Sequence, residues 1–520
     1  MNSKPGERLS RKKTTAWNLT LEYVVIVISI VSRIILVPLY LRYVPLDVYG
    51  AWLATGNVLV WLTAIDPGLS SILQQRIAAA YGKMDIQEIQ GYVGSGLLLS
   101  ILISILIIIS GLIISNFMIS WLRLPSSIDT GIILHAFRIS LIGSVLMIFS
   151  FSIIAVNRGF QSGIGVGSIS AVMNLLSVGV TVILLLRGFG LYALAAPSVI
   201  NGSGLILANL VYMRWRFHKG KIPFRFSLNR IGVVSKFMSV TFVARLANVV
   251  SKNVDLFVIG RYLGPEAVAS FNLTRRGPEM SQMFVERPAT AFMPAISHLT
   301  GSGEMEKARA VLLRLMRMMI WLLGIVVGGF IAFNGDFVRL WVGSHLFAGQ
   351  TINVLFCFGL LLSVVTISLG NLCFALGNIK GNSIATFAQA VLSLPLILLG
   401  AKHLGSLGVA LAPIIATLAV TAWYFPLSFS RLLKLKPEDC RAIGRELIAV
   451  LTVTVPLTLC GVMFQLGSWS SFSLVVSIYA ISYVAGLYAL SANLRMESRH
   501  VFSRLSGIAK PLVQEHANFK

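Results

Sequence analysis

The sequence predicts an all-α polytopic membrane protein with about fourteen transmembrane helices. Of its 520 residues, 56% are hydrophobic and only 12% are charged, whereas about 25% of the residues of a soluble globular protein are charged. The mean hydropathy is +0.82. The run Leu97–Ile114 contains eighteen residues without a charge, which is about the length that an α-helix needs to cross a hydrocarbon core of roughly 30 Å. A chain of this composition has too few polar residues to cover a soluble surface.

The predicted spans are apolar segments separated by polar junctions that contain Gly or Pro. They are 17–44, 48–80, 88–121, 128–157, 165–186, 190–213, 231–262, 266–298, 308–333, 347–376, 381–401, 406–430, 443–466 and 471–493. The first span is too long for the core of a signal peptide and has no evident small-residue cleavage site. We therefore expect it to remain in the protein as the first helix.

The distribution of Lys and Arg supports this number of spans. With both chain ends in the cytoplasm, 29 of the 43 Lys and Arg residues fall in cytoplasmic segments, 6 on the opposite side and 8 inside spans. Cytoplasmic loops of membrane proteins carry an excess of Lys and Arg, and one missed helix would scramble the alternation. We therefore interpret the net charge of +24 as charge that sets the orientation and faces anionic lipid, rather than as a nucleic-acid-binding surface.

A short repeated pattern indicates an internal duplication. Segment 31–43 (Val-Ser-Arg, then Arg-Tyr) and segment 250–262 (Val-Ser-Lys, then Arg-Tyr) match at five positions with a constant offset of 219 residues. Six helices per copy would place both copies in the same orientation, related by a pseudo-two-fold axis along the membrane normal. The expected organisation is a basic cytoplasmic tail (1–16), an N-lobe (17–213), a basic cytoplasmic loop (214–230), a C-lobe (231–430), two further helices (443–493) and a basic cytoplasmic tail (494–520). This last tail fits either an interfacial amphipathic helix or a disordered segment.

Ionisable residues inside the predicted spans are the candidate functional residues. A charge at the bilayer centre costs about 2.5–3.5 kcal/mol even on the scale derived from insertion experiments, so such residues should face a water-filled cavity or a partner. At about 100° per residue, they form narrow polar stripes. The stripes are Glu22, Ser29 and Arg33 on the first span; His135 and Arg138 on the fourth; Arg245, Asn248, Lys252 and Asp255 on the seventh; and Arg275, Glu279, Gln282 and Glu286 on the eighth. One interpretation is a shared aqueous lumen, and the other is a set of ion pairs that lock the bundle.

The cations of these stripes predict an anionic substrate. Arg33 and Lys252 occupy equivalent positions in the two copies, so a pseudo-two-fold axis would place them across one cavity. Two facing cations repel unless an anion lies between them, and a pyrophosphate group suits Arg and Lys donors. The predicted substrate-binding residues are Arg33, Arg138, Arg245, Lys252 and Arg275.

Acidic residues and prolines in the same spans complete the candidate site. Asp66, Asp255, Glu279 and Glu286 are candidates for coupling to a proton or another cation. Pro67 and Pro288 lie at matching places in the second and eighth spans, and Pro278 follows Gly277. Proline leaves a carbonyl without its helical donor and bends the helix. We therefore expect these positions either to form part of a gate of the transport pathway or to be ordinary helix kinks.

No motif for catalysis is present in the sequence. There is no Walker A, GxSxG or HExxH pattern, and the four cysteines have neither CxxC nor metal-ligand spacing. We therefore expect neither an enzyme nor a bound metal or cofactor. The energy for transport would come from a gradient, a partner or the concentration difference of the substrate itself.

Three segments carry a resemblance to a known family. They are Asp-Pro-Gly-Leu at 66–69, the stretch from Asp255 to Phe271, and Ala-Leu-Gly-Asn at 375–378. Together with the arrangement of six, six and two spans and the basic N-terminus, they resemble the Wzx-type polysaccharide-transport flippases of the MOP exporter superfamily, to which MATE and MurJ proteins also belong. The resemblance covers nearly the whole chain.

This resemblance implies a bacterial inner-membrane protein with both ends in the cytoplasm. It would flip an undecaprenyl-pyrophosphate-linked oligosaccharide to the periplasmic leaflet by alternating access of two lobes, for O-antigen, capsule or exopolysaccharide assembly. The implied partners are this lipid-linked oligosaccharide and membrane lipids, with a polysaccharide polymerase and a chain-length regulator as candidate protein partners and no nucleic acid.

Three other functions stay open. A drug or metabolite/cation antiporter of the same superfamily usually has twelve spans and an acidic cavity, so the two additional helices and the cationic stripes argue against it. A lipid II flippase shares the plan of fourteen spans. A membrane scaffold for a polymerase complex would gain nothing from buried charge stripes, and would tolerate their neutral substitution.

Overall fold

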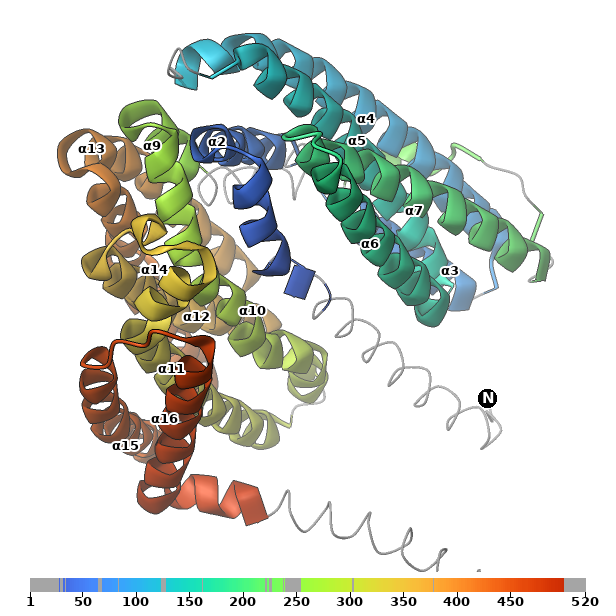
Figure 1. Cartoon of the computed structure of the whole chain (residues 1–520). Helices are drawn as coiled ribbons and strands as arrows, with labels where there is room; N and C mark the ends of the chain where they lie inside the picture. Colours follow the sequence, from blue (N-terminus) through green and yellow to red (C-terminus); the bar gives the residue numbers. More distant parts are fainter. Residues whose placement is uncertain are drawn as a thin grey trace, which may run out of the picture. The chain divides into compact units, whose positions relative to one another are not determined.

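The computed structural model of the chain consists of α-helices joined by short connections (Figure 1). It describes residues 28, 31–32, 34–63, 68–82, 84–122, 128–160, 162–219, 222–223, 227–236, 238, 254–301, 304–376 and 378–499. Within these ranges there is no β-strand, and nine helices are long and apolar enough to cross a membrane. The predicted all-α polytopic fold class is confirmed, and the helices are consistent with fourteen spans.

The first of two compact units comprises Met1–Asn272 and Thr386–Pro413. Its helices are α2 (Leu46–Thr63), α3 (Leu69–Gly82), α4 (Ile86–Leu122), α5 (Thr130–Gly159), α6 (Gly163–Leu186), α7 (Tyr192–Lys219) and α9 (Asp255–Leu263), with the start of α10 (Pro265–Gly301) and the middle of α13 (Ile379–Ala419).

Helix α5 is the central helix of this unit. Its apolar stretch is 61% buried, compared with 28% for α4 and 11% for α6, and Ile133 and Phe137 on it are fully buried. The outer face of α4 exposes large apolar side chains, among them Ile105, Ile109 and Phe117. A soluble protein rarely exposes such a continuous apolar surface. On a membrane helix, these apolar side chains face the acyl chains of the lipid.

The start of α2 packs directly on α9 and on the start of α10. A Cβ atom added to Gly50 would lie 1.9 Å from the carbonyl oxygen of Pro265, so the two main chains are in contact. One turn further along α2, Ala54 faces Gly260 of α9, where an added Cβ atom would lie 3.0 Å from the Ala54 Cβ atom. Small residues at a crossing allow helices in a membrane to approach closely.

The second unit comprises Leu273–Ala385 and Ile414–Lys520. It contains most of α10, α11 (Met305–Val342), the short 3₁₀-helix η1 (Ser344–Leu346), α12 (Gln350–Ala375), both ends of α13, α14 (Thr421–Leu433), α15 (Pro437–Val462) and α16 (Trp469–Leu490). Helix α13 includes the predicted span 381–401 and the start of the span 406–430. The two runs meet at Gly405, whose φ of 61° and ψ of −141° interrupt the helix, a conformation that glycine adopts without a steric penalty.

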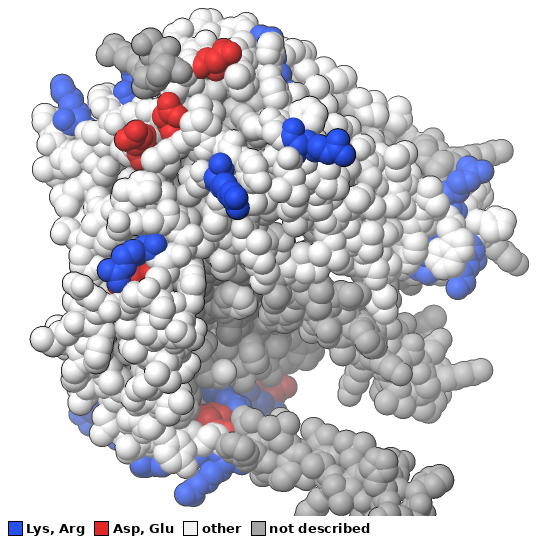
Figure 2. Space-filling model, viewed as in Figure 1, with Lys and Arg blue, Asp and Glu red and all other residues white. Residues whose placement is uncertain are grey.

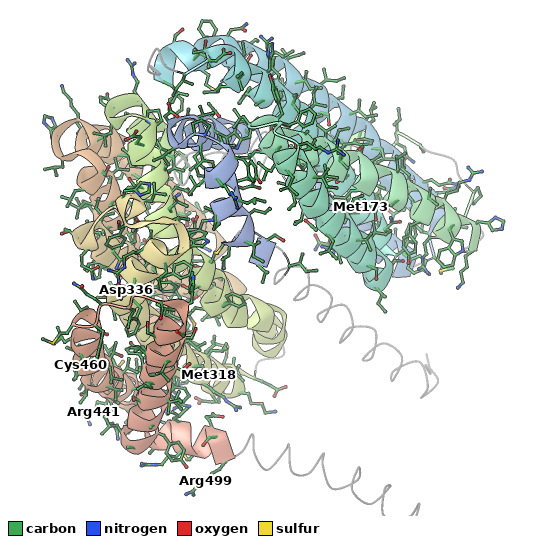
Figure 3. All side chains as sticks on the ribbon, viewed as in Figure 1. Met173, Met318, Asp336, Arg441, Cys460 and Arg499 are labelled. Carbon is green, nitrogen blue, oxygen red and sulfur yellow. The ribbon has the colours of Figure 1, made fainter. Side chains whose placement is uncertain are left out.

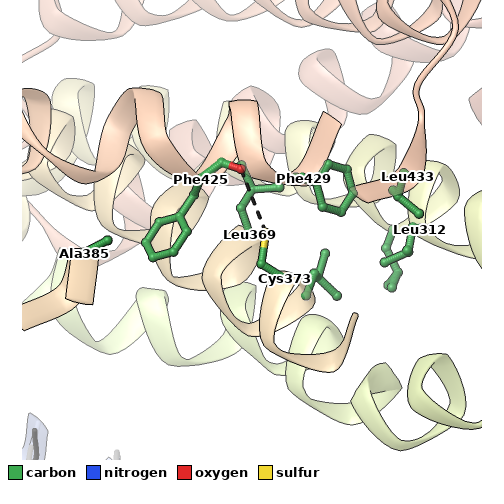
Figure 4. Close-up of a cluster of buried hydrophobic side chains, with 9 residues drawn as sticks. Leu312, Leu369, Cys373, Ala385, Phe425, Phe429 and Leu433 are labelled. Carbon is green, nitrogen blue, oxygen red and sulfur yellow. Dashed lines mark hydrogen bonds between the residues drawn. The ribbon is translucent and has the colours of Figure 1, made fainter. Parts of the chain in front are cut away.

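An apolar cluster joins α11, α12 and α14 in this unit (Figure 4). Phe425 and Phe429 of α14 pack against Leu369 and Cys373 of α12, and Leu312 adds a side chain from α11. The Cys373 thiol donates to the main-chain carbonyl of Phe425 at 3.9 Å. Cys373 therefore serves as a small apolar residue, as its position in an apolar span predicts.

Buried polar contacts hold α15 and α16 on α11. The Glu446 carboxylate, 4% exposed, accepts hydrogen bonds from the Trp321 indole at 2.8 Å and from Ser491 and Asn493 at 2.7 Å each. The Tyr483 hydroxyl donates to the Trp321 carbonyl at 2.6 Å. The two additional C-terminal helices are thus joined to the unit by specific hydrogen bonds as well as by apolar packing.

Charged side chains lie mainly near the ends of the helices in this unit. Asp336 lies towards one end, where its carboxylate accepts from the Leu466 main-chain N–H at 3.1 Å, and Arg441 and Arg499 lie towards the other end (Figure 3). The described surface between such charges consists largely of uncharged side chains (Figure 2), many of them exposed large apolar residues. This distribution is typical of helices that cross a bilayer.

Candidate functional site

The described part of the candidate site is the polar face of α10, formed by Arg275, Glu279, Gln282 and Glu286. Arg275 and Glu279 lie one helical turn apart, with the arginine Nε atom 3.7 Å from a Glu279 carboxylate oxygen. Further along, the Gln282 side-chain amide donates to the Glu286 carboxylate at 2.5 Å. The four side chains are thus arranged as two successive pairs along one side of the helix.

The charged side chains of this polar face are partly exposed on the surface of α10. The Glu279 side chain is 60% exposed and that of Arg275 is 21% exposed. An ionised carboxylate at the depth of the acyl chains would require water or a polar partner. An ion pair between partly exposed groups contributes only about 0–1 kcal/mol, so Glu279 is a weak partner that a stronger anion could replace at Arg275.

A proline lies within this face and changes the hydrogen bonding of α10. Pro278 is buried and has no N–H, so it provides no helical donor for the carbonyl of Thr274, four residues earlier. The side-chain amide of Asn334 on α11 donates to this carbonyl at 2.9 Å. Gly277 allows α11 to come so close, because a Cβ atom there would lie 2.6 Å from the Phe330 ring.

The donor that Asn334 supplies belongs to a buried polar network. The same amide donates to the Asn353 side-chain oxygen at 2.7 Å, and the Asn353 amide donates to the Phe330 carbonyl at 3.0 Å. The Thr274 hydroxyl accepts from the Ala348 main-chain N–H at 2.8 Å. Thr274, Asn334 and Asn353 are not among the residues that the sequence pattern predicts for the site. Asparagines in apolar spans are a signal of buried hydrogen bonding, but no local pattern connects Asn334 with a carbonyl sixty residues earlier.

Two other predicted residues are described, both in the first unit. Arg138 on α5 is half-buried, and its guanidinium lies 3.5 Å from the Asn116 side-chain oxygen of α4. Asp255 is the first residue of α9, and its carboxylate accepts the main-chain N–H of Leu256 at 2.8 Å. Asp255 therefore satisfies a donor at a helix start, where an acidic residue is also favoured by the helix dipole.

The other predicted site residues lie in parts of the chain, or have side chains, that the structure does not describe. Arg33, Asp66, Pro67, Arg245 and Lys252 are not among the described residues, and Pro288 lies in α10 but its side chain is not described. The pair of facing cations, Arg33 and Lys252, and the lumen between the two copies therefore stay predictions. The amphipathic pattern beyond residue 500 also lies outside the described chain.

The described residues include potential metal ligands and four cysteine thiols. Among the described residues, no group of three or more His, Cys, Asp or Glu residues could hold a metal ion. Cys357 and Cys373 are buried, Cys440 and Cys460 are exposed, and all four are free thiols.

The apolar helices define a multi-pass membrane protein, and its fold is that of solved flippases and transporters. Two solved structures share that fold. A lipid II flippase, MurJ, in an inward closed conformation matches with a TM-score of 0.69 at 14% identity, over 92% of this chain and 99% of that one. An inward-facing multidrug resistance transporter of the MATE family, from the MOP superfamily, matches with a TM-score of 0.62 at 15% identity, over 80% of this chain and 96% of that one.

The chain belongs to the polysaccharide biosynthesis protein family, which matches residues 12–300. The uncharacterized membrane protein EpsK of Bacillus subtilis (strain 168) is 23% identical over 499 residues, which are 91% of this chain and 94% of that protein. The expected resemblance to polysaccharide-family membrane proteins is thereby confirmed, and the fold is the one shared by MurJ and MATE structures. The solved structures of the same fold are of flippases and transporters rather than enzymes.

Proposed function

We propose that this protein flips an undecaprenyl-pyrophosphate-linked oligosaccharide across the bacterial inner membrane by alternating access, for the assembly of a cell-surface polysaccharide. Membership of the polysaccharide biosynthesis family and the flippase fold support this proposal. The observation that carries it is the pair of Arg275 and Glu279 on α10, one helical turn apart, with the arginine Nε atom 3.7 Å from the carboxylate.

The chemistry of the site follows from this pair. A pyrophosphate group offers several charged oxygens to a planar guanidinium, which makes a stronger partner than one carboxylate at 3.7 Å. Arg33, Arg138, Arg245 and Lys252 are the further cations that would hold the pyrophosphate or acidic sugars. Glu279, released from Arg275 when the substrate binds, would be free to take up a proton or another cation, as would Asp66, Asp255 or Glu286.

The orientation of the chain in the membrane is part of the proposal. Both ends would lie in the cytoplasm, where the basic segments 1–16, 214–230 and 494–520 face anionic lipid. A polymerase and a chain-length regulator would receive the flipped oligosaccharide on the periplasmic side.

A direct test uses Arg275 and its neighbour. In a strain that lacks the native gene, we expect Arg275→Ala to abolish polymer export at normal protein level and Arg275→Lys to retain part of it. Arg276→Ala is the matched control, because this adjacent arginine is also half-buried but lies about 100° away around the helix. Normal export by Arg275→Ala would refute the proposed site.

The competing substrates are tested in the same way. Rescue of a strain depleted of its lipid II flippase would favour lipid II, which the solved relative MurJ is named for. Resistance to cationic drugs on expression would favour an antiporter. We expect no drug resistance, because an arginine on the polar face of α10 disfavours a cationic substrate. We expect no rescue by lipid II transport, because the chain belongs to the polysaccharide biosynthesis family.

A further inference from the structure

Asn334 of α11 lies outside the polar face of α10 but makes a hydrogen bond to the main chain beside Pro278. Pro278 lies between Arg275 and Glu279, and Thr274, whose carbonyl loses its helical donor, directly precedes Arg275. Asn334 donates to that carbonyl at 2.9 Å. Thr274 and Asn334 are 0% and 1% exposed, so water does not satisfy the carbonyl in place of the amide.

We propose that Asn334 is a positioning residue for Arg275. Its amide replaces the donor that Pro278 lacks, and so holds the main chain of α10 at the turn that carries Arg275 and Glu279. The inference rests on the proposed function, in which Arg275 binds the pyrophosphate of the substrate. It extends that function by adding a residue of α11 that acts through the main chain of α10 rather than by contact with the substrate.

Two further contacts make this connection specific. The Thr274 hydroxyl accepts from the Ala348 main-chain N–H at 2.8 Å, which holds the same residue from a second side. Asn353 of α12 orients the Asn334 amide by accepting from it at 2.7 Å. A buried carbonyl without a donor is costly in a membrane, so a change at Asn334 should displace the main chain of α10 rather than leave it in place.

The hydrogen bond is tested with a double-mutant cycle of Asn334→Leu and Pro278→Ala. Alanine restores an N–H at position 278, which can donate to the Thr274 carbonyl within the helix. We therefore expect Asn334→Leu to lower the thermal unfolding midpoint of the purified full chain by several degrees, and to lower it much less in the Pro278→Ala background. The bond from Asn334 to Asn353 is lost in both backgrounds and cancels in this comparison.

The positioning role is tested with the same variants and undecaprenyl pyrophosphate as the probe. Binding is measured in lipid nanodiscs from the concentration at which the probe raises the unfolding midpoint. We expect Asn334→Leu to weaken binding about tenfold, because a misplaced binding group loses much of its effect, and we expect Pro278→Ala with Asn334→Leu to recover most of it. The matched control is Tyr483→Phe, which removes a buried hydrogen bond to the Trp321 carbonyl of the same unit, 2.6 Å long, and should leave binding unchanged.

Each outcome decides the proposal. An equal loss of stability from Asn334→Leu in both backgrounds would show that the amide does not replace the missing donor. Unchanged binding by Asn334→Leu, beside weakened binding by Arg275→Ala, would overturn the positioning role alone. Unchanged binding by Arg275→Ala would overturn the proposed function together with the positioning role.

Discussion

The side-chain amide of Asn157 on α5 donates to the main-chain carbonyl of Asn209 on α7 at 3.0 Å and to its side-chain oxygen at 3.3 Å. Both residues are fully buried in the first unit. The Asn209 amide in turn donates to the Leu205 carbonyl at 2.9 Å. This pair joins the central helix α5 to α7 by buried polar contacts.

We expect Asn157→Leu to destabilise the first unit by about 1 kcal/mol, the order measured for hydrogen bonds between membrane helices. Unfolding of the purified chain by denaturing detergent measures the change. Asn174→Leu is the control, because its amide bonds to the Ser170 carbonyl of its own helix at 2.8 Å. Equal effects of the two substitutions would contradict a role for Asn157 in joining α5 and α7.

Glu446 should be indispensable for attaching α15 and α16. Replacement by Leu leaves the donors of Trp321, Ser491 and Asn493 without their acceptor, and we expect a loss of about 3 kcal/mol or more. Glu446→Gln keeps one acceptor oxygen and should be intermediate. Limited proteolysis and the unfolding midpoint measure the effect, and Glu438→Leu on the exposed first turn of α15 should change neither.

The crossing of α2 and α9 should separate during transport. An added Cβ atom at Gly260 would lie 3.0 Å from the Ala54 Cβ atom, so cysteines placed there can form a disulfide once the helices shift apart by roughly half an ångström to the usual Cβ separation of about 3.5–4.5 Å. In a background with Cys440→Ser and Cys460→Ser, we expect an oxidant to cross-link Ala54→Cys to Gly260→Cys and to stop polymer export until a reductant is added. Full export by the cross-linked protein would show that these helices need not part, and each single-cysteine variant is a control for oxidation.

The native Cys440 reports the predicted orientation of the chain. It is exposed in the first turn of α15, in a basic segment predicted to be cytoplasmic. A cysteine in place of Gly467, between α15 and α16, should face the periplasm. We expect a membrane-impermeant maleimide to label Cys440 only in inside-out vesicles and Gly467→Cys only in intact spheroplasts. Labelling of Cys440 from outside would reverse the topology, and Cys440→Ser controls for reaction at other thiols.

Local features of this chain, such as its apolar helices, follow from the sequence pattern. The apolar spans 88–121 and 128–157 correspond to α4 and α5 within a few residues, because composition and helical period are local properties of the chain. The stripe of the eighth span needed only that period, and α10 carries its four residues. The interruption at Gly405 lies between two predicted spans, 381–401 and 406–430, because glycine separates apolar runs in sequence as it interrupts helices in space.

The sequence by itself thus determined that this is a helical membrane protein and where many of its apolar helices lie, since transfer to lipid depends on the composition of each segment. The predicted span 48–80, in contrast, contains two separate helices, α2 and α3. The tertiary structure alone decided the partners: Asn334 with the Thr274 carbonyl, Asn157 with Asn209, Glu446 with Trp321 and Gly50 with Pro265. Each of these pairs lies far apart along the chain. Such contacts depend on how helices pack against one another, which the local pattern of any one helix does not specify.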